Sequence, residues 1–167
     1  MYEHLLVPLD GSNAAERVLE HTEAIAKAFA SKVTLLRATI SAETLLAETA
    51  GTGPASGDLG PVIDPTPIVE IDRETAEEYL SAVAQRLREH NLTVDTEYPE
   101  GPAATEIVER ARALNVSLIL MTTHGRSGLG RVIFGSVADS VMRHASCPVL
   151  LVRVTDADDD EKSEPSN

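Results

Sequence analysis

Aromatic residues and cysteine are scarce in this sequence, and long apolar runs are missing from it. Of the 167 residues, 3% are aromatic, none is tryptophan and a single one, Cys147, is cysteine. One cysteine excludes an intramolecular disulfide, and its place before Pro148 favours a small buried hydrophobe over a reactive thiol. Apolar runs such as 149–152 are far shorter than the roughly 20 residues of a membrane-spanning helix. The N-terminus carries no basic segment followed by an apolar one, so we expect a cytoplasmic protein.

Basic residues are also few. The chain has 27 acidic against 14 basic residues, a formal net charge of −13, and its lysines are Lys27, Lys32 and Lys162. Nonspecific nucleic-acid binding depends on Lys and Arg neutralising phosphates, so this balance argues against it. An acidic, lysine-poor surface favours a halophilic setting, because molar salt shortens charge repulsion to about 3 Å.

Familiar metal and catalytic motifs are absent as well. The 5 histidines are scattered, with no pair at i, i+4 and no cysteine at metal-ligand spacing, so a structural metal is not expected. There is no G-x-S-x-G elbow, and Ser12, Ser127 and Ser136 are explained as helix caps or loop donors. Nothing in the sequence requires an enzyme.

What the chain does contain is an alternation of short apolar runs and amphipathic stretches. The runs predict strands over 4–9, 33–38, 92–98, 117–121 and 148–154. Apolar positions at helical spacing predict helices over 13–30, 74–91, 102–114 and 135–144. Such alternation implies parallel strands joined by right-handed crossovers. The predicted fold is α/β, a doubly wound five-stranded parallel sheet with helices on both faces.

The length and the 43% apolar content fit one domain, which we place at 1–154. Glycine and proline cluster between 41 and 67, so a flexible loop insertion is predicted there. Residues 155–167 are acidic without apolar periodicity, which predicts a solvated, disordered tail.

Two loops follow the carboxyl ends of predicted strands, where doubly wound sheets bind ligands. The first is Asp10-Gly11-Ser12, and the second contains THGRSGLGRVIFGS at 123–136. Glycines allow backbone N–H groups to approach an anion, the helix beginning near Gly135 favours negative charge, and the loop contains two arginines. The glycine spacing matches neither common nucleotide motif. From the residues alone, a phosphate cradle and a plain connector both remain open.

The segments 4–26 and 101–154, with their motifs in matching order and distance, resemble the universal stress protein family. The resemblance implies a small Rossmann-like, adenine nucleotide α-hydrolase-like domain that commonly forms homodimers. ATP-binding members carry G-x2-G-x9-G-[ST]. Here Gly125, nine intervening residues and Gly135-Ser136 match that pattern, but Thr122 stands where the first glycine belongs.

The resemblance also implies which residues contact the nucleotide. Pro8 and Asp10 would lie near the ribose and base, and Ala38 near the adenine. Thr122 either obstructs the ligand with its β-branched side chain or contributes a hydroxyl. Mg or Mn would accompany the ATP phosphates. The phosphates themselves would be held by backbone and hydroxyl groups of Gly125, Arg126, Gly135, Ser136 and Val137.

The C-terminal strand is a candidate dimer interface. An edge strand exposes backbone groups that a two-fold partner can cover, and the resemblance implies a homodimer of this kind. A strand buried within the monomer is the alternative. The predicted interface residues are Val149, Leu150, Leu151, Val152, Arg153 and Val154.

We therefore expect a stress-response module that binds ATP or a related adenine nucleotide and acts through a homodimer, with at most slow hydrolysis. The alternative is a dimeric member of the same family that binds no nucleotide and serves as a protein-interaction module. Thr122 separates these two. An enzyme of the wider adenine nucleotide α-hydrolase group is not expected, because the S-G-G-x-D-S pyrophosphate motif is absent.

Overall fold

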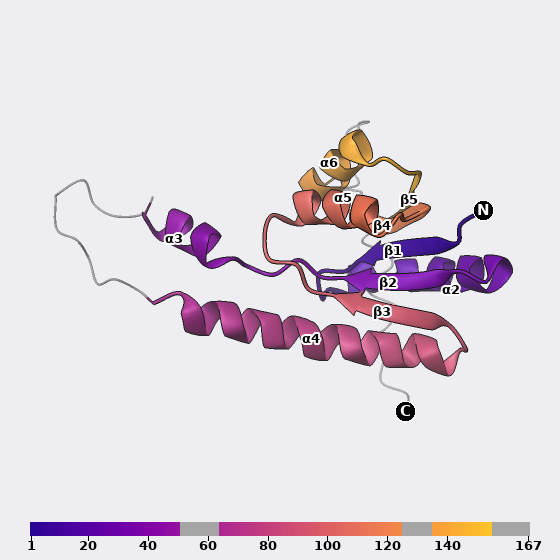
Figure 1. Ribbon diagram of the computed structural model, residues 1–167, viewed down its shortest axis with the longest axis horizontal. Helices are drawn as coiled ribbons and strands as arrows, with labels where there is room; N and C mark the ends of the chain where they lie inside the picture. Colours follow the sequence, from indigo (N-terminus) through magenta and orange to yellow (C-terminus); the bar gives the residue numbers. More distant parts are fainter. Residues whose placement is uncertain (51–63, 125–134, 155–167) are drawn as a thin grey trace, which may run out of the picture.

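Five parallel strands form a sheet in the order β3-β2-β1-β4-β5 (Figure 1). The computed structural model describes residues 1–50, 64–124 and 135–154, so the predicted tail and the residues Gly125 and Arg126 lie outside the described part. The predicted doubly wound five-stranded sheet is confirmed. The strands are β1 (His4–Pro8), β2 (Lys32–Leu36), β3 (Thr93–Glu97), β4 (Leu118–His124) and β5 (Val149–Val154).

β1 lies at the centre because the chain winds outward from it in both directions. One half runs from β1 through β2 to β3, and the other adds β4 and then β5 on the opposite side. β1 pairs with β2 from His4 opposite Lys32 to Pro8 opposite Leu36, and with β4 at Leu5 opposite Leu118. The strand order thus reverses between β1 and β4, which is where such sheets place ligands.

Each face of the sheet carries its own apolar core, because side chains alternate along a strand. Leu5 and Val7 of β1 pack with α2 (Val18–Phe29) and α4 (Thr66–Glu89) on one face. Leu6, between them, packs on the other face with α5 (Ala103–Ala113) and α6 (Ser136–His144). Figure 1 shows α5 and α6 on one side of the sheet and α4 on the other.

The predicted helix over 13–30 is two helices, α1 (Asn13–Glu16) and α2. Ser12 caps α1 by accepting a hydrogen bond from the Ala15 N–H at 3.1 Å. The Arg17 N–H then bonds to the Ala14 carbonyl at 3.3 Å, a tighter pattern than the α-helical one, and α2 starts at the next residue. The short α1 therefore belongs to the turn that follows β1.

The loop predicted over 41–67 is wrong for its described parts, which are helical. α3 spans Ala42–Ala50 and α4 already begins at Thr66 rather than at 74. Ser41 caps α3 by accepting the Thr44 N–H at 3.2 Å, and the glycines and prolines of this region lie almost entirely between the two helices. The extra turns of α4 expose Ile68 and Ile71, so no amphipathic stripe marked them as helix.

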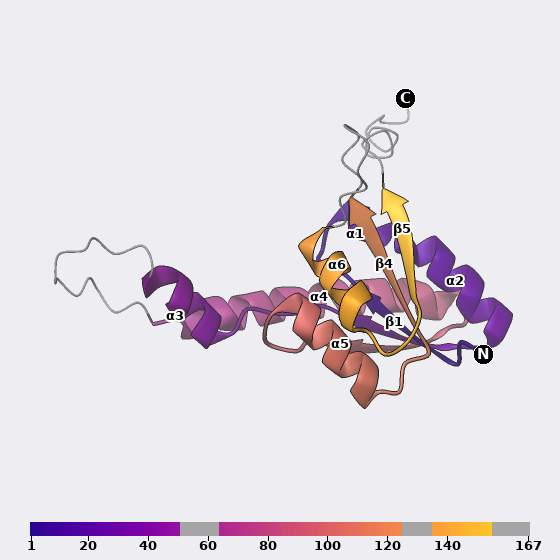
Figure 2. The ribbon, with the colours of Figure 1, turned by 90° about the horizontal axis from the view of Figure 1, so that it is seen from above.

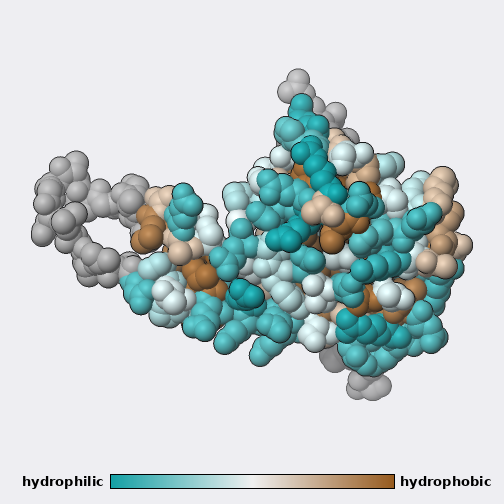
Figure 3. Space-filling model, viewed as in Figure 1, coloured by the Kyte–Doolittle hydropathy of each residue, from teal (hydrophilic) through white to brown (hydrophobic). Residues whose placement is uncertain are grey.

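α3 and the first turns of α4 extend beyond the carboxyl ends of β2 and β3 (Figures 1 and 2). Apolar side chains gather between these two elements on the face seen in Figure 3, while hydrophilic residues cover most of the remainder. Within the described residues, none of the helices has the length and apolar character needed to cross a membrane.

Candidate functional site

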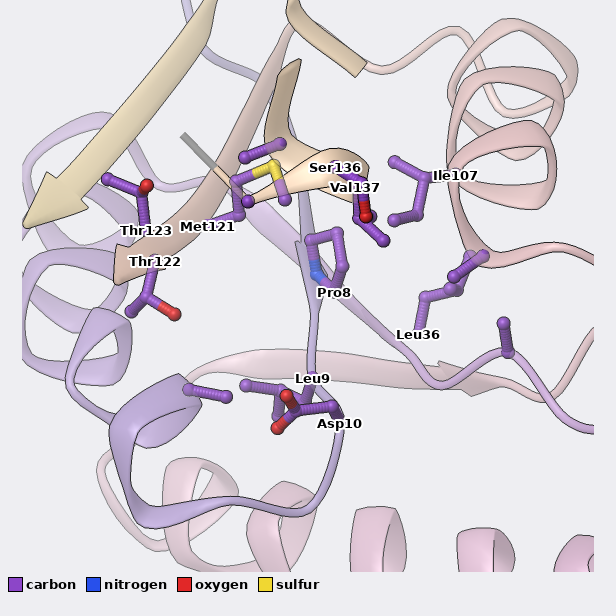
Figure 4. Close-up of a pocket in the computed structure, with 15 residues that line it drawn as sticks. Pro8, Leu9, Asp10, Leu36, Ile107, Met121, Thr122, Thr123, Ser136 and Val137 are labelled. Atoms are coloured by element: carbon purple, nitrogen blue, oxygen red, sulfur yellow. The ribbon is translucent and has the colours of Figure 1, made fainter. Parts of the chain in front are cut away.

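A cavity of about 250 Å³ opens at the carboxyl ends of β1 and β4, where the strand order reverses (Figure 4). Residues from β1, β2, β4, α1, α5 and α6 meet around it. The structure brings together every described residue of the predicted nucleotide site. These residues are Pro8, Asp10, Ala38, Thr122, Gly135, Ser136 and Val137.

The turn after β1 holds Asp10 at the mouth of the cavity. Its Oδ1 accepts a hydrogen bond from the Ser12 N–H at 2.9 Å, and Gly11 between them has a φ of +90° that favours glycine. The Asp10 carboxylate is exposed and lines the cavity. The role of Asp10 as a turn former is thus directly visible, and the same turn presents its carboxylate to any ligand.

The N-terminus of α6 forms a second wall. Gly135 is the N-cap residue and has an ordinary φ of −58°, and no side chain among the described residues caps the helix. The first N–H groups of a helix have no partner within the helix, and together with the helix dipole they favour an anion. A Cβ placed on Gly135 would meet no described atom within 4 Å. Among the described residues, this end of the cavity therefore has backbone donors with space in front of them.

β4 contributes two threonines. Thr122 is partly buried, and Figure 4 shows its hydroxyl directed toward the side of the cavity where Asp10 lies. Thr123 is 5% exposed, and its hydroxyl has no hydrogen-bond partner among the described residues. Burying a hydroxyl without a partner costs free energy, and Figure 4 shows this hydroxyl directed away from Pro8 and Asp10.

The remaining wall is apolar. Leu36 at the end of β2, Ile107 of α5 and Met121 of β4 line the cavity together with Ala38. An apolar wall beside a few polar groups is typical of pockets that bind flat organic rings. Sequence reasoning missed Leu36, Ile107, Met121 and Thr123, because each carries only the apolar or strand signal of a core position.

β5 lies at the edge of the sheet and pairs with β4. Val149, Leu150, Leu151 and Val152 are partly buried, Arg153 is exposed and Val154 is buried. The edge position leaves one side of β5 without a strand partner within the described chain. The predicted interface thus stands on an available edge, and dimer formation stays a prediction.

Metal ligands and reactive thiols do not add to this site. Among the described residues, no group of three or more His, Cys, Asp and Glu side chains lies close enough to hold a metal ion. Cys147 is partly buried, and burial raises the pKa of its thiol, which keeps it in the unreactive protonated form.

Taken together, the fold and the cavity define a doubly wound α/β domain with a ligand-sized cavity at its topological switch point. Residues 1–153 match the model of the universal stress protein family, and the chain belongs to that family. One relative, the universal stress protein MJ0531 of Methanocaldococcus jannaschii, is 34% identical over 92% of this chain and 83% of its own length.

Solved structures agree with the fold. The protein MJ0577 of Methanocaldococcus jannaschii has a TM-score of 0.73 and 26% identity, covering 93% of this chain and 99% of that one. A universal stress protein from Archaeoglobus fulgidus, solved in complex with dAMP, has a TM-score of 0.61 and 20% identity, covering 90% of this chain and 97% of that one. At that identity, the second likeness concerns the fold alone.

Proposed function

We propose that this universal stress protein binds ATP or a related adenine nucleotide in the cavity between β1 and β4 and acts as a homodimer. The observation that carries the proposal is the pairing, in one cavity, of an apolar wall with an uncapped helix N-terminus. A base needs the first feature and a phosphate chain the second. The protein is proposed to be a binding module with at most slow hydrolysis.

Different residues of the site would contact the adenine, the ribose and the phosphates. Leu36, Ala38 and Ile107 offer an apolar surface for the adenine, and Asp10 a carboxylate for ribose hydroxyls. Ser136 and Val137 would direct backbone N–H groups at the phosphates. The dAMP complex of the Archaeoglobus fulgidus protein supports an adenine nucleotide as the ligand class for this fold.

A divalent ion would enter with the phosphates. Mg²⁺ usually keeps several waters and is bound through one or two carboxylates together with phosphate oxygens. Asp10 is the one carboxylate among the described cavity residues and is assigned to the ribose, so phosphate oxygens and water would supply the ligands of the ion. The proposed cofactor is therefore ATP with Mg or Mn, and the ion would neutralise charge on the phosphates.

The second candidate is a dimeric interaction module that binds no nucleotide. It is favoured by Thr122, which replaces the first glycine of the motif and places a β-branched side chain at the cavity. In this case the cavity would be a vestige of the fold, and β5 would remain the functional surface.

Titration calorimetry on the full chain distinguishes these candidates. ATP with magnesium should bind once per chain, and ADP and AMP more weakly. GTP should bind least of all, because guanine places two exocyclic polar groups against the apolar wall where adenine places one. If the protein is folded and light scattering shows a dimer, but ATP, ADP and AMP give no binding heat, the first proposal is wrong and the interaction module is favoured.

A further inference from the structure

Arg37 lies directly behind the turn that carries Asp10, on the side away from the cavity. Its neighbours Leu36 and Ala38 line the cavity, whereas the Arg37 side chain packs toward α4 and the β1 turn. Its Nη1 lies 3.5 Å from the point where a Cβ on Gly11 would stand. The guanidinium is therefore a neighbour of the turn that sets the position of Asp10, separated from its backbone by a space that a methyl group would fill.

Two side chains of α4 hold this guanidinium in place. Its Nη2 lies 3.5 Å from Asp72 Oδ1, and its Cζ lies over the Tyr79 ring at 5.9 Å from the centroid. A planar guanidinium suits both contacts, because it can pair with a carboxylate while it stacks on an aromatic face. Arg37 thus bridges α4 and the β1 turn.

This ion pair is less exposed than a typical surface pair. The Arg37 and Asp72 side chains are 17% and 20% exposed, against 69% and 43% for Arg143 and Asp139. Removing a guanidinium from water costs free energy that only well-placed partners offset. The placement of Arg37 is consequently specific, and deleting one partner leaves the other charge poorly solvated.

Asp72 extends the connection to the start of the α3 segment. Its second oxygen, Oδ2, accepts a hydrogen bond from the Ile40 N–H at 2.8 Å. The backbone after β2 is thereby tied to α4 on both sides of Ala38, by the Arg37 side chain before it and the Ile40 N–H after it. One carboxylate on α4 holds the segment that carries the predicted adenine contact.

We propose that Arg37 is a positioning residue for the candidate nucleotide site, and that Asp72 locks it in place. The guanidinium limits how far the Gly11 turn can move away from the cavity and so keeps the Asp10 carboxylate at the cavity mouth. The effect on nucleotide affinity rests on the proposed function above. The support of the turn does not, because it is a property of the free protein.

The test compares R37Q, R37K and D72N with R110Q, a control that removes an arginine paired with Glu97 at 3.3 Å on the other face of the sheet. The first readout is amide hydrogen exchange by NMR in the nucleotide-free proteins, at Ser12 and Ala15, which donate within the turn. The second is the dissociation constant for ATP with magnesium. R37K keeps the positive charge but lacks the planar guanidinium with its several N–H donors, and so provides a folded variant if R37Q is unstable.

We expect exchange at Ser12 and Ala15 to rise about tenfold in R37Q, and ATP affinity to fall by about the same factor, as for loss of a charge-assisted contact. Amide exchange and ATP affinity should change in D72N as much as in R37Q. In R37K both should lie between the values of R37Q and the unmodified chain, and in R110Q both should equal those of the unmodified chain. A merely structural role would raise exchange evenly across β1 and β2 instead. Unchanged local protection in folded R37Q and R37K would overturn the proposal, even if the unmodified protein bound no nucleotide and the function proposed above had failed.

Discussion

Thr122 of β4 stands directly opposite Val152 of β5 in the sheet register. The residue that departs from the nucleotide motif is therefore a neighbour of the central residue of the predicted dimer strand. Thr122 lines the cavity, and Val152 packs against the core on the α2 and α4 face. Changes at either position should be measured by both ligand binding and oligomeric state.

Thr122 can be tested with two variants that separate its hydroxyl from its bulk. Thr122→Val keeps the β-branched shape and removes the hydroxyl, and we expect ATP binding to weaken by about 0.5–1.5 kcal/mol, the usual net value of a hydrogen bond. Thr122→Gly removes both and restores the motif. Tighter binding by the valine variant in calorimetry would show that the hydroxyl hinders the ligand.

Gly135→Val should abolish nucleotide binding without unfolding the protein. A Cβ at Gly135 meets no described atom within 4 Å, and the φ of −58° suits any residue, so the fold tolerates the substitution at the cost of a less favoured N-cap residue. The added side chain would occupy space in front of the α6 N-terminus. Thermal unfolding should stay cooperative, with a modestly lower midpoint, while calorimetry loses the ATP signal. If the variant binds as tightly as the unmodified chain, the phosphates do not lie at this end of the cavity.

Val152→Asp should convert the dimer to monomers. A carboxylate on β5 would add like-charge repulsion between the two copies across a two-fold axis, and because Val152 also packs against the core, it would carry a desolvation cost within each chain. Thr93→Asp on β3, the opposite edge of the sheet, is an exposed control and should leave the mass unchanged. Light scattering reads the outcome, and circular dichroism checks that both variants are folded. A dimer that survives Val152→Asp assembles through another surface.

His4 should make stability depend on pH. Its Nδ1 lies 3.2 Å from the Leu114 carbonyl and its Nε2 2.8 Å from Thr34 Oγ1, at the start of the central strand. Burial lowers the pKa of His4 below that of the unfolded chain, about 6.5. The unfolded state therefore binds more protons in acid, so this contribution is complete above pH 6.5 and is lost as the pH falls toward the folded pKa.

The measurement is urea unfolding of the unmodified chain and His4→Gln from pH 8 to pH 5. The unmodified protein should lose more stability on acidification than the variant does. Parallel pH curves for the two proteins would show that His4 binds protons equally in the folded and unfolded states.

Gly11→Ala should destabilise the protein by about 1–2 kcal/mol, the cost of holding a residue with a Cβ in left-handed backbone. The added Cβ would have room, since Arg37 Nη1 would lie at an ordinary contact distance of 3.5 Å, so the backbone alone is responsible. Gly135→Ala, at an ordinary φ, is the control and should cost less than Gly11→Ala, because it loses only the N-cap preference for glycine over alanine. Equal unfolding midpoints for the two variants in urea would contradict this account.

The order of strands and helices could be read from the sequence because its signals are local. Alternating periodicities place every strand of the sheet within a few residues, and the Asp10-Gly11-Ser12 turn is marked by its own composition. Where glycines and prolines nearby masked the helical signal of a short segment, the predicted loop was wrong. The segment 42–50 contains no glycine or proline, yet its breaker-rich continuation led to a loop being expected where α3 forms.

The sequence by itself therefore determined the family, the fold class and the Asp10-Gly11-Ser12 turn at the cavity, since each depends on residue types at short spacing. Only the tertiary structure decided which buried residues became cavity walls. Leu36, Ile107 and Met121 have the same pattern as core residues, and what distinguishes them is how β2, α5 and β4 are placed around the cavity. The contacts of Arg37 were likewise decided by the tertiary structure. Its partners Asp72 and Tyr79 are distant in sequence and meet it only when α4 packs on the sheet.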